Sequence, residues 1–428
     1  MHMLSPCVAL PVALLGCVGS LEVHPERAIH IAELNAMPEM TWSAAAHPRF
    51  ASQAPGASRD LCGVQGNQTE IIELAVAQGR ISRFSADANF TPPTSFDSEA
   101  EWPQCAKVIG DIRDQSNCGC CWAFAGVEAA SDRMCIATKA ALMLPLSAQD
   151  VCFNANFDGC GGGQIGAPWH YIQTWGAVTG GQYNGSGPFG SGLCSSFALP
   201  HCHHHGPQGD DPYPAEGQPG CPSQQSPKGP RSCDSTAKDP HKNFEDDKYT
   251  FSGTVISPSG ELAIQQAIME GGPVEVAFTV YSDFENYAGG IYQHKSGGSV
   301  GGHAVKMVGW GVDHGVKYWK VANSWNPYWG EKGYFRIVRG KNECGIESQA
   351  VASSADAKWE KRPPGPTPPP VPSCPGCKSG NLCSKLGMFC CCGPNATSHS
   401  THCTHKPQCC CGAKQSEVVV AEQSEVVV

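Results

Sequence analysis

Charged side chains are scarce in this chain of 428 residues: Asp, Glu, Lys and Arg make up 16% of it, and its formal net charge is −10. An acidic surface with few charges argues against nucleic-acid binding. Long apolar runs are missing as well. The run from Val8 to Val18 is too short to cross a bilayer, and no other stretch reaches the roughly 18 apolar residues that a span needs. We therefore expect a soluble mature protein without a membrane span.

Cysteine, in contrast, is abundant. Twenty-five cysteines are too many for a reducing cytosol, so we expect disulfides and an oxidising compartment. Residues 1–20 have the apolar run and small residues of a signal peptide, but no Lys or Arg, which leaves a disordered N-terminus as the alternative. Glycosylation sequons begin at Asn67, Asn89, Asn184 and Asn395. These features predict the secretory pathway, with a lysosome, vacuole or the cell exterior as destination.

Three distant stretches supply the parts of one catalytic site. They are residues 115–122 (QSNCGCCW), 301–304 (GGHA) and 322–325 (ANSW). A thiol nucleophile needs an imidazole to ionise it, a group that orients the imidazole, and donors for the oxyanion. Cys121, His303, Asn323 and Gln115 can fill these roles. The sequence therefore predicts a cysteine-type peptidase acting on peptide and protein substrates.

The run from Cys118 to Trp122 resembles the signature of papain and the cathepsins, C-G-[SA]-C-[WY], with Cys120 at the small residue. His303 and Asn323 follow Cys121 by 182 and 202 residues, about 50 more than in that family. Cathepsin B-like members carry an inserted loop with paired histidines behind a cysteine, and residues 200–205 (PHCHHH) match it. The likeness covers about residues 28 to 355. It implies an α+β, papain-like fold with a helical left lobe and an antiparallel, β-barrel-like right lobe.

Local patterns agree with two such halves. An Ala-rich stretch without proline predicts a helix over 121–138, and a second helix over 261–270 ends at Gly-Gly-Pro. Alternation over 274–280 predicts a strand with one buried face. Further strands are expected over 304–310, 318–321 and 334–339.

The chain also divides into segments. We expect a signal peptide (1–20), a propeptide (21–92), a catalytic domain (93–358) with an inserted loop at about 194–233, a Pro-rich linker (359–373), a Cys-rich module (374–412) and a repeat tail (413–428). The resemblance implies that the propeptide lies in the cleft as an inhibitor; the alternative is an ordinary extension. The module resembles granulin loosely, and Cys374-X-X-Cys377 leaves metal binding open, although export favours disulfides.

The resemblance assigns roles to the catalytic residues. Cys121, at a helix N-terminus, would be a thiolate paired with the His303 imidazolium. Asn323 would orient His303, and Trp325 would shield that contact and form the floor of the primed side of the cleft. Gln115 and the Cys121 N–H would hold the oxyanion. No cofactor or metal is needed.

Substrate contacts also follow from the resemblance. Gly162 and Gly163 would pair with the substrate backbone. His204 and His205 would bind a C-terminal carboxylate, so that dipeptides are released. Asp114 would bind His204, the first of these histidines, and so act as a latch that keeps the inserted loop closed.

Two departures from the cathepsin B pattern weaken that latch and change the specificity. Tyr328 replaces an acidic latch residue, which favours an open loop and endopeptidase cleavage. Gln349 replaces the acid that accepts arginine in the second pocket, so hydrophobic side chains should be preferred there. The alternatives are a predominantly endopeptidase enzyme with a mobile loop, and a non-catalytic binding protein that acts through its Cys-rich module. We expect a monomer.

The resemblance also implies disulfide pairs: Cys118–Cys160, Cys105–Cys135 and Cys202–Cys221. Cys120 has no counterpart in the family, and its thiol could be oxidised with another cysteine. The pairing of Cys152, Cys194 and Cys233 stays open at the level of sequence.

Overall fold

The computed structural model describes residues 22–156, 158–201, 224–363, 382–385 and 388–391. Its helices are α1 (Pro25–Ala36), α2 (Gln68–Ala77), α3 (Ser98–Glu101), α4 (Ala106–Ile109), α5 (Cys121–Ala137), α6 (Ala148–Ala155), α7 (Ala167–Trp175) and α8 (Glu261–Gly271). Short 3-10 turns include η1 (Ala57–Leu61) and η5 (Phe284–Asn286). None of the helices in these ranges is long and apolar enough to cross a membrane.

The strands form three sheets. They are β1 (Trp42–Ala44), β2 (Ser82–Phe84), β3 (Phe96–Asp97), β4 (Ala177–Val178), β5 (Lys248–Ser252), β6 (Val255–Pro258), β7 (Val274–Tyr281), β8 (Tyr287–Tyr292), β9 (Ser299–Asp313), β10 (Val316–Ala322), β11 (Tyr334–Val338), β12 (Ala350–Ser353), β13 (Lys358–Lys361), β14 (Leu382–Lys385) and β15 (Met388–Cys391). The largest sheet has the order β1-β8-β11-β10-β9-β7-β12-β6-β2, with β3 beside β9. Its pairs are antiparallel except β8–β11 and β2–β6.

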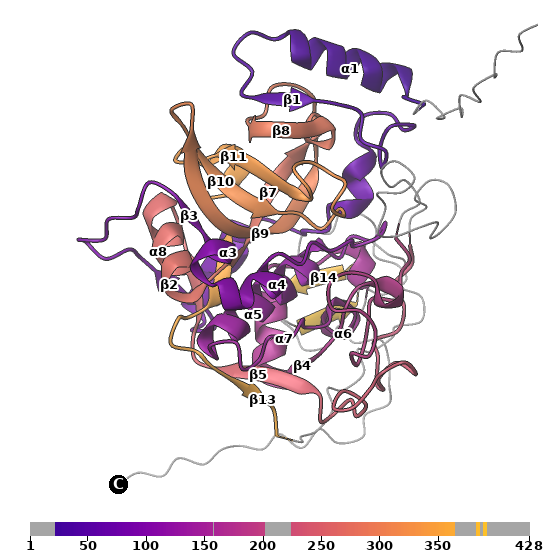
Figure 1. The fold of residues 1–428 in the computed structure, drawn as a ribbon, viewed down its shortest axis with the longest axis vertical. Helices are drawn as coiled ribbons and strands as arrows, with labels where there is room; N and C mark the ends of the chain where they lie inside the picture. The colour runs from indigo at the N-terminus through magenta and orange to yellow at the C-terminus, as the bar shows by residue number, and fades with distance from the viewer. Residues whose placement is uncertain (1–21, 157, 202–223, 364–381, 386–387, 392–428) are drawn as a thin grey trace, which may run out of the picture.

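Figure 1 shows two regions. The strands β7 to β11 make one region, and helices α4 to α7 with the small sheet β13-β5-β4 make the other. Helix α5 packs against both β9 and β7 and is buried along nearly its whole length. Apolar burial along this helix therefore joins the two regions. The expected α+β, papain-like architecture is confirmed.

The predicted helices and strands are present, with one correction. Strand β7 is buried on both faces, although its sequence alternates. Glu275 accepts a hydrogen bond from Trp169 Nε1 at 2.8 Å, and Ala277 is buried as well, because α5 covers the face that was expected to be exposed. Burial raises the pKa of Glu275 well above its usual value.

The N-terminal segment, residues 22–92, wraps one side of the molecule. Helix α1 and strand β1 cover β8, where Trp42 pairs with Gly290 (Figure 1). Residues 61–65 then continue across the start of α5, and β2 joins the other end of the sheet beside β6. This segment therefore passes directly over the predicted catalytic residues.

The C-terminal module is described only as the antiparallel hairpin β14–β15. The disulfides predicted for residues 374–412, and the repeat tail, lie outside the described residues.

Candidate active site

The four predicted catalytic residues come from four parts of the chain and meet at one place. Cys121 is the first residue of α5, and His303 lies in β9. Asn323 follows β10, and Gln115 precedes the turn into α5. Each is at most 1% exposed. The segment 22–92 covers them, which accounts for this burial.

The imidazole is oriented as expected. Asn323 Oδ1 lies 2.8 Å from His303 Nε2. The Trp325 ring lies against the His303 ring, with centroids 5.0 Å apart and planes inclined by 33°. Trp325 thus shields the Asn323–His303 contact from water, which strengthens that contact. The structure brings these three residues together.

Gln115, the expected oxyanion donor, is held in place by the opposite region. Gln115 N donates to Ser324 O at 2.9 Å, and Ser324 Oγ donates to Gln115 Oε1 at 2.8 Å. With its amide oxygen bonded in this way, Gln115 directs Nε2 toward the Leu61 carbonyl (3.0 Å) and the Cys118 carbonyl (2.7 Å). Sequence reasoning missed Ser324, although it stands between two residues that were identified.

A peptide segment of the chain itself occupies the site. The Leu61 carbonyl accepts from Gln115, and Gly63 N donates to Cys121 Sγ at 3.3 Å. The thiol therefore faces a hydrogen-bond donor instead of an electrophilic carbonyl carbon. This geometry explains how a chain can lie across the nucleophile without being attacked.

The predicted glycines contact the same segment. Gly163 N donates to Gly63 O at 2.8 Å, and Gln65 N donates to Gly163 O at 2.9 Å. A Cβ on Gly163 would lie 2.5 Å from the Trp122 ring, and one on Gly162 would lie 2.4 Å from Gly63 O. Only glycine leaves room for a peptide backbone here.

Because residues 61–65 cover the site, the Cys121 thiol and the His303 imidazole are both kept neutral. Burial raises the pKa of the Cys121 thiol to about 11, although the backbone N–H groups of Ala304, Gly63 and Trp122 oppose this shift. Burial lowers the pKa of His303 to about 4, against the hydrogen bond with Asn323. The thiolate–imidazolium pair expected from the sequence is thus disfavoured while residues 61–65 exclude water.

In this covered state Asp114 lies beside Arg49 and His201, and its role as the partner of the first loop histidine stays a prediction. Its Oδ1 accepts from Arg49 Nη1 at 3.2 Å, and its Oδ2 lies 3.6 Å from His201 Nδ1. His204 and His205, its expected loop neighbours, lie outside the described residues. Arg49 was missed because its role depends on a contact between residues 65 positions apart.

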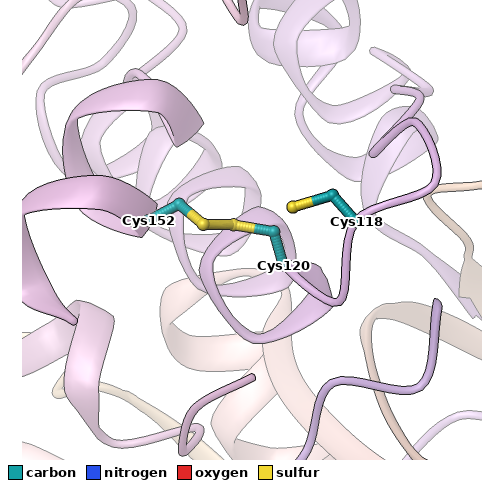
Figure 2. A group of neighbouring side chains, drawn as sticks. All are labelled: Cys118, Cys120 and Cys152. Atoms are coloured by element: carbon teal, nitrogen blue, oxygen red, sulfur yellow. A yellow bond between two sulfur atoms is a disulfide. The ribbon is translucent and has the colours of Figure 1, made fainter. Parts of the chain in front are cut away.

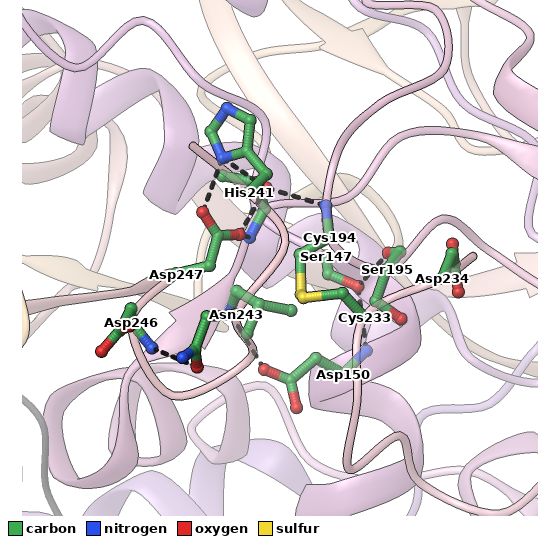
Figure 3. The surroundings of a disulfide bond; sticks show 12 residues. Ser147, Asp150, Cys194, Ser195, Cys233, Asp234, His241, Asn243, Asp246 and Asp247 are labelled. Carbon is green, nitrogen blue, oxygen red and sulfur yellow. Dashed lines mark hydrogen bonds and ion pairs between the residues drawn. A yellow bond between two sulfur atoms is a disulfide. The ribbon is translucent and has the colours of Figure 1, made fainter. Parts of the chain in front are cut away.

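The base of the inserted loop is fixed by the Cys194–Cys233 disulfide (Figure 3). Ser147 Oγ donates to Ser195 O at 2.6 Å, and Asp234 N donates to Cys194 O at 2.6 Å. Cys202 and Cys221, predicted to close this loop, lie outside the described residues. Gln349 donates to Gly345 O at 3.3 Å, and its subsite role stays a prediction.

The expected disulfides Cys118–Cys160 and Cys105–Cys135 are confirmed, and the cysteine next to the nucleophile is paired as well. Cys120 bridges Cys152 of α6. Figure 2 shows this bridge beside Cys118; one sulfur from each of the three cysteines lies within 4.8 Å of the others. All three are buried. The structure engages all three sulfurs in disulfides, which leaves no thiolate among them as a metal ligand.

We expect the double variant Cys120→Ala/Cys152→Ala to lose about 2–4 kcal/mol of stability, because the bridge closes a loop of 32 residues. Denaturant unfolding of the precursor measures this loss. In Cys152→Ser alone, the Cys120 thiol should become an additional alkylation site in the unfolded chain, besides the free thiols Cys62, Cys121 and Cys344. Mass mapping that finds Cys120 unpaired in the native protein would contradict the assignment.

Comparison with known proteins agrees with this geometry. The profile of papain family cysteine proteases matches residues 92–354. "Cathepsin B-like cysteine proteinase 6" of Caenorhabditis elegans is 42% identical over 315 residues, covering 72% of this chain and 78% of its own. A cathepsin B-like cysteine proteinase of Schistosoma japonicum is 41% identical over 325 residues, covering 75% and 89%.

Among solved structures, procathepsin B S9 from Trypanosoma congolense superposes with a TM-score of 0.59 at 28% identity, covering 76% of this chain and 97% of its own. That protein is a precursor, in keeping with the segment found across the site here. The chain belongs to the papain family of cysteine proteases, among its cathepsin B-like members.

Proposed function

We propose that this cysteine peptidase is made as a zymogen and hydrolyses peptide bonds through Cys121 and His303. Residues 21–92 are the inhibitory propeptide, and the mature enzyme begins near Pro93. The observation that supports this most directly is the Leu61–Gly63 segment, which places a carbonyl at Gln115 and an amide at the thiol. Secretion to a lysosome, a vacuole or the cell exterior fits the disulfides.

The reaction follows from these positions. Once the propeptide leaves, water and the N-terminus of α5 stabilise the thiolate, and His303 holds the proton. Cys121 Sγ attacks the substrate carbonyl carbon, and the oxyanion is bound by Gln115 Nε2 and the Cys121 N–H. His303 gives its proton to the leaving amine as the C–N bond breaks. Water, deprotonated by His303, then hydrolyses the thioester and regenerates the thiol.

The release of dipeptides from C-termini belongs to the same proposal, alongside endopeptidase cleavage. It rests on His204 and His205, whose protonated rings would bind a terminal carboxylate. Endopeptidase activity is supported by Tyr328, which stands where the related enzymes have an acidic latch. The assembled catalytic residues speak against a purely non-catalytic binding protein.

The proposed binding of a C-terminal carboxylate by His204 and His205 is tested with one peptide in two forms, a free C-terminal acid and its amide. Near pH 5.5 we expect the acid form to lose its dipeptide about ten-fold faster, because only the acid carries a charge for the imidazolium pair. His205→Ala should abolish this preference, whereas the matched control His203→Ala should keep it. Equal rates for the two forms with the wild-type enzyme would remove the dipeptidase part of the proposal.

A further inference from the structure

A guanidinium is bound in a fully buried pocket away from the catalytic thiol. Arg27 of α1 is 0% exposed. Its Nη2 donates to Glu285 Oε2 at 2.8 Å, and its Nη1 donates to Asn286 Oδ1 at 2.8 Å. Its remaining bonds go to the carbonyls of Gln53 and Ala54, within its own segment. The catalytic domain thus contributes a carboxylate and an amide oxygen side by side, from η5.

Every hydrogen bond to the Glu285 carboxylate comes from the predicted propeptide, as far as the described residues show. Besides Arg27, Gly56 N donates to Oε2 at 3.0 Å and Ser58 N donates to Oε1 at 2.7 Å. Asn286 is also fully buried, and its Nδ2 has no partner in the described part of the chain. When residues 21–92 are removed, a carboxylate with three empty acceptor positions is left beside a free amide.

This pocket lies on the leaving-group side of the cleft. Phe284, next to Glu285, packs on Trp325 with ring centroids 5.7 Å apart, and Trp325 packs on His303. His303 protonates the leaving amine, so the part of a substrate beyond the cleaved bond lies on this side. Gly163, which was predicted to pair with the substrate backbone, binds the segment on the other side of Cys121.

The propeptide itself measures the separation. Ser58 N is bound at Glu285 and Gly63 N at Cys121 Sγ. The chain between these two residues includes the 3-10 turn η1, so the two bound points lie closer together than the roughly 18 Å that five extended residues span. An arginine up to about six residues beyond the cleaved bond of an extended substrate therefore reaches the pocket.

We propose that Glu285 and Asn286 form an exosite of the mature enzyme, which binds an arginine side chain of protein substrates within about six residues C-terminal to the cleaved bond. This inference rests on the proposed peptidase function. Arginine is favoured over lysine, because two adjacent acceptors match a planar fork of donors.

The test uses internally quenched peptides that differ at one position, five residues after the cleaved bond, which carries arginine, citrulline or lysine. Citrulline keeps the shape of arginine without the charge. With wild-type mature enzyme we expect kcat/KM to be about three- to ten-fold higher for arginine than for citrulline, with lysine between them, and the ratio should fall in high salt.

The variant enzyme is Glu285→Gln. Because Glu285→Gln alone would leave Arg27 buried without its ion pair, the precursor carries Arg27→Gln as well; residue 27 is lost on maturation, so the mature product differs from wild type only at Glu285. Glu360→Gln on exposed β13, at the far end of the molecule in Figure 1, removes the same charge as a control.

The arginine-to-citrulline ratio should fall to about one in Glu285→Gln and stay unchanged in Glu360→Gln. Equal cleavage of the two peptides by wild type, or a ratio that survives Glu285→Gln, overturns the exosite while leaving the peptidase function intact. Failure to hydrolyse any of the peptides counts against both.

Discussion

Replacing Cys121 with serine is expected to lower kcat/KM of the activated protein by about 10⁴-fold or more, because a neutral hydroxyl is a far weaker nucleophile than a thiolate beside an imidazolium. The fold should survive, because serine is close to cysteine in size and Cys121 forms no disulfide. Hydrolysis of a fluorogenic peptide measures the loss, and a circular dichroism spectrum checks the fold.

Cys344 supplies the matched control. It is the other free cysteine of the described catalytic domain, and it lies in η6 (Glu343–Gly345), outside the group of catalytic residues. Cys344→Ser should retain activity, and alkylation of this variant should still inactivate it. Peptidase activity that persists in Cys121→Ser at the wild-type level would falsify the assignment of the nucleophile.

Acid is expected to release the inhibitory segment. Burial lowers the pKa of His47 from 6.5 to about 3, helped by nearby Arg49 and Arg27, and burial lowers the pKa of His303 to about 4. Both rings are therefore neutral in the covered state but take up protons below about pH 6.5 once exposed. Since the open state binds more protons, the stability of the covered state is complete above pH 6.5 and falls toward pH 3–4, by a few kcal/mol in all.

The full-length Cys121→Ser protein isolates this effect, because it cannot cleave itself. Hydrogen exchange at the amides of Gly63 and Gly163, corrected for intrinsic rates, should report an opening constant that rises at least 100-fold between pH 6.5 and 4. His47→Gln removes one titrating ring and should flatten the profile. The exposed His314→Gln should leave it unchanged. A profile that is flat in the unmodified Cys121→Ser protein would contradict the proposed acid trigger.

Many helices and strands could be predicted, because the residues within each short stretch of sequence determine where the helix or strand begins and ends. The Ala-rich stretch after Cys121 forms α5, and Gly271–Gly272 ends α8 where a left-handed Gly272 (φ +99°) is required. The candidate catalytic residues could be identified because an amide, a thiol, an imidazole and a second amide, in this order along the chain, can serve one reaction. Such features depend on short stretches of sequence.

What could not be predicted depends on distant contacts. The Cys120–Cys152 pair requires α6 to lie against the start of α5, which no spacing reveals. The burial of Glu275 depends on the helix that covers β7, and the pairings of Arg49 and Arg27 depend on how the N-terminal segment crosses the molecule. For Glu275, Arg49 and Arg27 a polar or alternating pattern predicts exposure, but tertiary packing buries these side chains.

The disulfide beside the nucleophile has a practical consequence for handling the enzyme. Activation assays of thiol peptidases add reductant to free the catalytic sulfur, and the same reagent attacks neighbouring S–S bonds. Here two cysteines that form such bonds, Cys118 and Cys120, lie within the three residues before Cys121. Cys120 and Cys152 are both buried, whereas Cys160 is only partly buried, so the Cys118–Cys160 bond should be reduced first and sets the upper limit on the useful dose of reductant.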